Sequence, residues 1–157
     1  MPAAARVTDM TIHGTPFVPG TGSANVLIGN LPALRAMSPA AVASFVALVA
    51  KIAVNAQKLA AALTSNNVPA AAEATNNLKD DVPAAANMIA AMDKIVCPML
   101  LLKIGGPPNG PGVIIGGSTT VQINGLPAGR ATDQIREVLA LDPNMVAVGF
   151  PTVQIGG

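Results

Sequence analysis

The chain has 157 residues and a formal net charge of +1; only 11% of its residues are charged, while 51% are hydrophobic. That length is one domain, or a smaller domain with an insertion, and the apolar composition argues against intrinsic disorder. The near-neutral charge and the lack of Trp and Tyr argue against a surface that binds nucleic acid.

A short phrase recurs along the chain and divides it into three units. One copy occupies residues 26–36 (VLIGNLPALRA) and a second occupies residues 121–131 (VQINGLPAGRA). Residues 152–157 supply the front half of a third copy, and residues 2–9 at the N-terminus supply its back half. A repeat that is split across the two ends predicts that the termini lie side by side and close a pseudo-three-fold unit.

Outside its middle part, the chain predicts short strands and turns. Residues 26–28 and 121–123 are expected strands, and each enters a tight turn, at Gly29-Asn30 and Asn124-Gly125. Asn and Gly suit the positive φ angles of two-residue hairpin turns. Residues 105–112 are rich in Gly and Pro and predict a loop without a helix or a central strand.

The first unit carries an insertion. The interval from the repeat Arg to the next strand spans 20 residues from Arg6 to Val26 and 23 from Arg130 to Val153, but 86 from Arg35 to Val121. About 60 residues, roughly 38–96, are therefore inserted, and there the composition shifts to Ala, Leu, Met and Asn.

The inserted residues predict an α-helical hairpin. Ser38 and Pro39 suit the N-cap and the first helical position, and the apolar residues that follow have helical spacing over about 25 residues. After a turn at 64–67, a second helical stretch is expected to begin near Pro69 and to be broken or kinked at Pro83. The longest uncharged run of this Ala-rich part, residues 36–50, is shorter than the roughly 20 residues of a membrane span.

The repeats resemble a known motif. Pro32-Ala33-Leu34-Arg35 and Pro127-Ala128-Gly129-Arg130 resemble the Pro-Ala-Ala-Arg motif of PAAR-repeat proteins, and the flanking strands are similar as well. The resemblance implies a β-rich fold, a small pseudo-three-fold β-cone made of residues 1–37 and 98–157. Residues 38–97 would then be the inserted α-helical hairpin.

The resemblance also implies a function and a location. PAAR-repeat proteins are structural caps that sharpen the tip of a trimeric VgrG-like spike in type VI secretion systems and related contractile injection machines. They aid membrane puncture and carry cargo. We therefore expect a monomer on a trimer, assembled in the cytoplasm and then secreted on the machine, which meets the target membrane only transiently. Residues 1–9 contain no apolar signal-peptide segment.

Zinc is the cofactor that the resemblance implies. His13 and Cys97 match positions at which relatives bind zinc near the apex of the cone. Structural zinc takes four ligands, so Asp9, Asp133 or another chain would complete the set. The alternative is a packed His and a buried thiol without a metal.

The repeated arginines are the expected partner-binding residues. Arg6, Arg35 and Arg130 stand at equivalent positions and are expected to bond carbonyl or carboxylate groups of the spike. The alternative is that each arginine braces a turn within the chain. The insertion has two open interpretations as well, a docking site for an effector or chaperone and a decoration of the cone.

Enzymatic activity is not expected. No Ser-His-Asp set or carboxylate pair stands out, and a Cys97–His13 nucleophile pair is the one arrangement left. Two further classes stay open as alternatives. One is a secreted effector or cargo adaptor whose activity lies in the insertion, and the other is a free-standing adhesion module.

Overall fold

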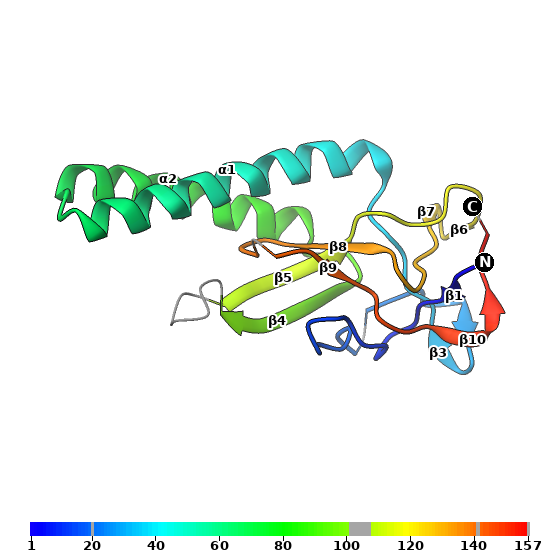
Figure 1. The fold of residues 1–157 in the computed structure, drawn as a ribbon. Helices are drawn as coiled ribbons and strands as arrows, with labels where there is room; N and C mark the ends of the chain where they lie inside the picture. The colour runs from blue at the N-terminus through cyan, green and yellow to red at the C-terminus, as the bar shows by residue number, and fades with distance from the viewer. Residues whose placement is uncertain (20, 101–107, 141, 157) are drawn as a thin grey trace.

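The computed structural model describes every residue except 20, 101–107, 141 and 157. It is a β-rich fold with a pair of inserted helices, which confirms the predicted fold class at that level (Figure 1). The elements are β1 (Ala3–Ala4), β2 (Leu27–Ile28), β3 (Leu31–Pro32), α1 (Pro39–Thr64), α2 (Val68–Met88), β4 (Lys94–Leu100), β5 (Pro108–Ile114), β6 (Gln122–Ile123), β7 (Leu126–Pro127), β8 (Gln134–Glu137), β9 (Asn144–Met145) and β10 (Phe150–Gln154).

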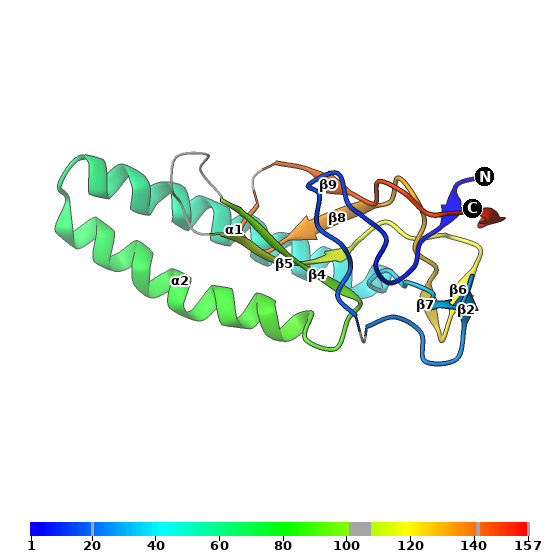
Figure 2. The ribbon, with the colours of Figure 1, turned by 90° about the horizontal axis from the view of Figure 1, so that it is seen from below.

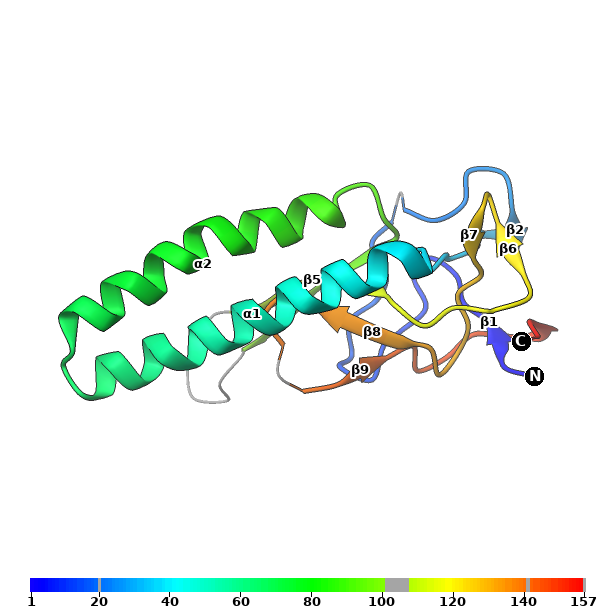
Figure 3. The same cartoon turned by 90° about the horizontal axis from the view of Figure 1, so that it is seen from above.

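Small β-hairpins with the same register gather at one end of the molecule. β2 pairs with β3, and β6 pairs with β7 in the equivalent way. β1 pairs with β10 through Ala3 and Gln154, so the two termini meet and replace the turn of the third hairpin. The predicted closure across the termini is confirmed, and both ends of the chain lie at this end of the molecule (Figures 1 and 3). This end is called the hairpin end below.

A ring of backbone hydrogen bonds joins the three units. The amide of Ala5 donates to the carbonyl of Gly129 at 3.0 Å, that of Gly129 donates to Leu34 at 2.8 Å, and that of Leu34 donates to Ala5 at 3.0 Å. Each of these residues directly precedes a repeat arginine. The ring therefore has the pseudo-three-fold symmetry that the repeats predict.

The hairpin turns have the conformation that their sequences predict. Gly29 and Asn30 have φ angles of 56° and 65°, and Asn124 and Gly125 have φ angles of 51° and 76°. Two successive positive φ angles match the right-handed twist of the strands that they join.

A four-stranded sheet, in the order β4-β5-β8-β9, runs from the hairpin end toward the opposite end of the molecule (Figures 1 and 3). The prediction of a loop at 105–112 is wrong for residues 108–112, which begin the central strand β5; residues 105–107 lie outside the described residues. Local composition misled the prediction, because Gly112 is required by packing. A Cβ at Gly112 would lie 2.7 Å from Cγ of Glu137 on the neighbouring strand.

The helical hairpin of the insertion is confirmed. α1 begins at Pro39 as predicted, although the side chain of Ser38 makes no capping hydrogen bond. Of the two alternatives expected at Pro83, the break is wrong, because α2 continues through Pro83 to Met88; a kink there stays a prediction. Residues 94–97, which the predicted boundary places in the insertion, belong to β4. The two helices lie side by side and extend past the sheet, away from the hairpin end (Figures 1 and 2).

The helical hairpin of α1 and α2 is anchored where it packs on the four-stranded sheet. Phe45, Val49 and Ile52 of α1 pack with Ala85 of α2 against Val113 and other buried residues of the sheet region. In the same part of α1, Nζ of Lys51 bonds Oδ1 of Asp81 on α2 at 2.8 Å. The insertion is thus part of the core at its near end, and its far end extends past the strands of the sheet (Figure 1).

α1 as a whole is long and apolar enough to cross a membrane, with a mean hydropathy of 1.7 in its most apolar stretch. Only 22% of that stretch is buried in the structure. The observation is weak evidence for a span, since core helices of soluble proteins meet the same criterion.

Candidate functional site

Each repeat arginine is paired with an aspartate of this chain. Arg6 bonds Asp9 at 3.0 Å, and Arg130 bonds Asp133 at 3.0 Å, in both cases three residues further on. Arg35 bonds Asp93 at 2.7 Å across a separation of 58 residues. The insertion therefore lies between Arg35 and its aspartate, inside a turn that the other two units keep intact.

These pairs match the brace interpretation of the arginines. Their side chains are only 17%, 19% and 13% exposed for Arg6, Arg35 and Arg130. The pair of Arg35 and Asp93 also holds the backbone of Gly22. Asp93 accepts a hydrogen bond from the amide of Gly22 at 2.8 Å, and Arg35 donates one to its carbonyl oxygen. Binding of the arginines to a spike stays a prediction.

The braces also have electrostatic consequences. Hydrogen bonding to Asp93 raises the pKa of Arg35 above its ordinary value, so the guanidinium stays charged. Burial raises the pKa of Asp133, although its hydrogen bonds with Arg130 act in the opposite direction.

One residue of each unit contributes to a candidate metal group. His13, Cys97 and Glu137 each follow the aspartate of their unit, Asp9, Asp93 or Asp133, by four positions. Because the units are related by the pseudo-three-fold ring, equivalent positions converge. The group lies beyond the braces, and Glu137 ends β8, which runs away from the hairpin end (Figure 3).

The donor atoms of this group are close together and shielded from water. Nδ1 of His13 lies 3.2 Å from Oε1 of Glu137 and 3.9 Å from Sγ of Cys97, and all three donors lie within 4.8 Å of one another. Cys97 is 0% and Glu137 is 1% exposed. The predicted approach of His13 to Cys97 is confirmed.

One oxygen of the buried carboxylate has no protein partner. Oε1 of Glu137 accepts from Nδ2 of Asn144 at 2.6 Å, but Oε2 is buried without a hydrogen bond. A buried, unpaired carboxylate oxygen is costly, and a cation beside it removes that cost. This oxygen is the observation that favours a metal ion over a merely packed His and thiol.

Burial raises the pKa of the Cys97 thiol, and the nearby Glu137 acts in the same direction, against hydrogen bonds with Met99 and Thr15. A metal-free Cys97 is therefore a poor nucleophile at neutral pH, because the thiolate is the reactive form.

The sequence predicted two of the three donors. Asp9 and Asp133, the carboxylates expected to complete the ligand set, are instead committed to Arg6 and Arg130. Glu137 was missed, although its position four residues after Asp133 repeats that of His13 after Asp9.

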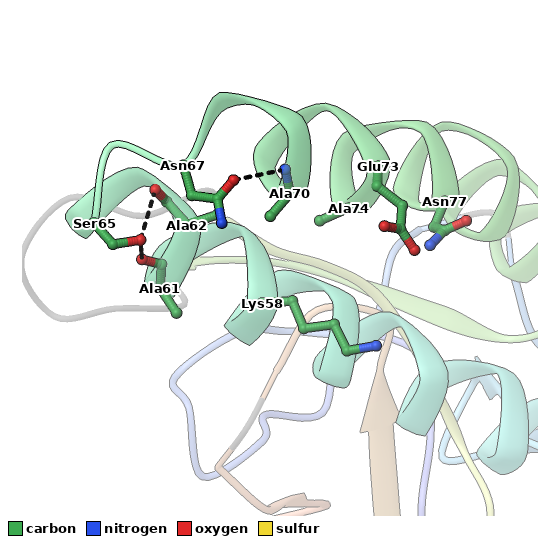
Figure 4. Close-up of a pocket in the computed structure, with 9 residues that line it drawn as sticks. All are labelled: Lys58, Ala61, Ala62, Ser65, Asn67, Ala70, Glu73, Ala74 and Asn77. Atoms are coloured by element: carbon green, nitrogen blue, oxygen red, sulfur yellow. Dashed lines mark hydrogen bonds between the residues drawn. The ribbon is translucent and has the colours of Figure 1, made fainter.

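A hollow of about 400 Å³ lies far from this group, between the helices near their connecting turn (Figure 4). Alanines form much of its wall, and Lys58 and Glu73 are the charged residues that line it. Its other polar lining residues are Ser65, Asn67 and Asn77.

Comparison of the chain with protein-family models and with curated proteins finds no match.

Proposed function

We propose that this protein caps the end of a trimeric VgrG-like spike and provides the tip of a contractile injection machine, as its resemblance to PAAR-repeat cones implies. The backbone ring formed by Ala5, Leu34 and Gly129 carries the proposal, since it gives a monomer pseudo-three-fold symmetry. A monomer of this kind matches a trimer unit by unit. On this proposal the protein is not an enzyme.

The hairpin end is the surface that would meet the spike. It presents short strands with unpaired edges, which a partner's strands can extend. It also exposes apolar side chains, among them Leu27 at 59% and Val153 at 37%. The helical hairpin occurs once in the chain and cannot match a trimer symmetrically. With the hairpin end on the spike, the far end of the helices would point forward, where cargo or a chaperone would meet it.

Zinc is the ion that fits the group of His13, Cys97 and Glu137. Zinc binds imidazole nitrogen, thiolate sulfur and carboxylate oxygen in tetrahedral sites. Ligand atoms in such sites lie about 3.3–3.7 Å apart, given metal–ligand distances of 2.0–2.3 Å. The separation of 3.9 Å between Nδ1 of His13 and Sγ of Cys97 is close to that geometry. The carboxylate of Glu137 is within reach as well, because its Oε1 lies 3.2 Å from Nδ1 of His13 and its Oε2 has no protein partner. A bound ion would join one residue from each unit and stiffen the end away from the spike.

Spike binding can be tested with two matched substitutions. Leu27→Asp places a charge on the hairpin end, and Val68→Asp places one on an apolar residue at the helical turn that is 75% exposed. Each variant is mixed with a trimeric VgrG-like spike protein, and the complex is measured by size-exclusion chromatography with light scattering. We expect one chain per spike trimer for the wild type and for Val68→Asp, and lost binding for Leu27→Asp.

Other outcomes would reject parts of the proposal. Loss of binding in Val68→Asp alone would make the helical insertion the docking element. No binding by the wild-type protein would reject the cap for the spike used and favour the effector, adaptor or adhesion classes. Zinc is tested separately by metal analysis of protein purified without chelators. Less than about 0.2 zinc ions per chain, unchanged in His13→Ala, would reject the metal without affecting the cap.

A further inference from the structure

The candidate metal ligands form a neutral group with a divalent ion. Cys97 binds a metal as a thiolate and Glu137 as a carboxylate, while His13 binds as a neutral imidazole. Two negative charges then balance the two positive charges of the ion. Because net charge is costly to bury, and Cys97 and Glu137 are almost fully buried, the positions of these two anionic ligands decide how well the ion is held.

Asn144 is placed to hold the carboxylate. It is 2% exposed and lies on β9, next to the strand that ends with Glu137. Its Oδ1 accepts from the backbone amide of Met145 at 2.8 Å, which orients the side-chain amide. Nδ2 therefore points at Oε1 of Glu137, at 2.6 Å, and leaves Oε2 for the ion.

Asn109 stands in a similar relation to the thiol. It is 4% exposed and lies on β5, where its neighbour Gly110 pairs with Cys97 across the strands. Its Nδ2 approaches Sγ of Cys97 at 3.9 Å. Each anionic ligand thus has one buried amide donor of its own, supplied by the adjacent strand.

We propose that Asn109 and Asn144 are the positioning residues of the metal centre, each holding one anionic ligand so that a divalent ion is bound as a neutral, buried group. The proposal rests on the zinc site proposed above. Residues that hydrogen-bond metal ligands orient them, and their loss typically lowers metal affinity 10–100-fold.

The test uses cobalt(II) as a coloured substitute for zinc. Asn144→Leu and Asn109→Leu remove the amide donors, and Asn87→Leu, at an exposed position of α2, is the control. Cobalt affinity is measured by competition with a chelator, and the thiolate-to-cobalt absorption band is recorded. We expect a 10–100-fold loss of affinity for both variants and none for the control. The absorption band should shift in Asn109→Leu and keep its position in Asn144→Leu.

A double-mutant cycle separates positioning from a merely structural role. In a Glu137→Gln background, Asn144→Leu should cause no further loss of cobalt affinity, because Asn144 acts through Glu137. An equal loss in both backgrounds would show a general effect on folding and overturn the proposal, as would wild-type affinity in Asn144→Leu. If Asn144→Leu does not fold, Asn109→Leu tests the proposal at the other anionic ligand, and wild-type cobalt affinity with an unshifted absorption band in that variant would overturn it. Glu137→Gln keeps an acceptor for Asn144 but lacks the charge, and unchanged cobalt affinity in that variant would also overturn the proposal.

A wild-type protein that binds neither zinc nor cobalt would reject both this inference and the zinc site. The proposed cap would be unaffected, since its test is spike binding.

Discussion

Replacing Asp93 by alanine should destabilise the protein more than removing the arginine that it binds. Asp93 is 2% exposed and accepts from the amide, Nε and Nη2 of Arg35 and from the amide of Gly22, at 2.7–3.0 Å. Asp93→Ala leaves the guanidinium without its counter-ion and two backbone donors without an acceptor. In Arg35→Ala, Asp93 still accepts from both backbone amides.

The magnitude follows from these partners. Removing one member of a buried ion pair costs about 3–5 kcal/mol, and we expect Asp93→Ala in that range. Arg35→Ala should cost about 1.5–3 kcal/mol, the usual worth of hydrogen bonds to a charged group. For a chain of this size, each kcal/mol lowers Tm by about 2–4 °C, so Asp93→Ala should lower it by about 10 °C.

Urea unfolding of the two variants, followed by circular dichroism, measures both free energies. Asp80→Ala, at an exposed position of α2, is the control and should change the free energy of unfolding by less than about 0.5 kcal/mol. A cost for Asp93→Ala equal to that of the control, or smaller than that of Arg35→Ala, would refute the brace.

Gly149→Ala should lower the free energy of unfolding in urea by about 1–3 kcal/mol, because the new Cβ would lie 2.7 Å from the carbonyl oxygen of Ala4. Gly116→Ala, whose Cβ would have its nearest atom at 3.7 Å, should leave the free energy unchanged, and equal effects of the two variants would contradict this packing. Metal-free protein should lose stability as the pH rises above about 8.5, because the raised pKa of Cys97 lets the unfolded chain release the thiol proton first. Urea midpoints at pH 8 and pH 10 measure this loss, and a loss as large in Cys97→Ser would exclude the thiol as its cause. Asp81→Ala should lower the free energy of unfolding in urea more than Lys51→Ala, since the side chain of Asp81 is 9% exposed and that of Lys51 is 62% exposed. A larger effect of Lys51→Ala would contradict the burial of Asp81.

Local patterns predicted α1 well. Its apolar spacing and the proline at its start are properties of neighbouring residues, and the structure begins the helix at the same proline. The same kind of argument failed for a helix break at Pro83 and for a loop at residues 108–112. There, packing against α1 and against β8 outweighs the local preferences of Pro and Gly.

The candidate site was only partly accessible to such reasoning. His13 and Cys97 were selected as the single His and the single Cys of the chain, at positions that match the motif. Asn144 carries no local signal, since buried asparagines cannot be told from exposed ones by residue type. Glu137 does carry one, because its four-residue offset from Asp133 repeats the offset of His13 from Asp9.

The sequence by itself determined the three units, the meeting of the termini and the helical nature of the insertion, because repeats and periodicity are written in neighbouring residues. Only the tertiary structure decided which aspartate pairs with Arg35 and which carboxylate joins His13 and Cys97. The insertion places 58 residues between Arg35 and Asp93, whereas the other two pairs are three residues apart. That pairing depends on the ring of backbone hydrogen bonds, which exists only after the three units have closed.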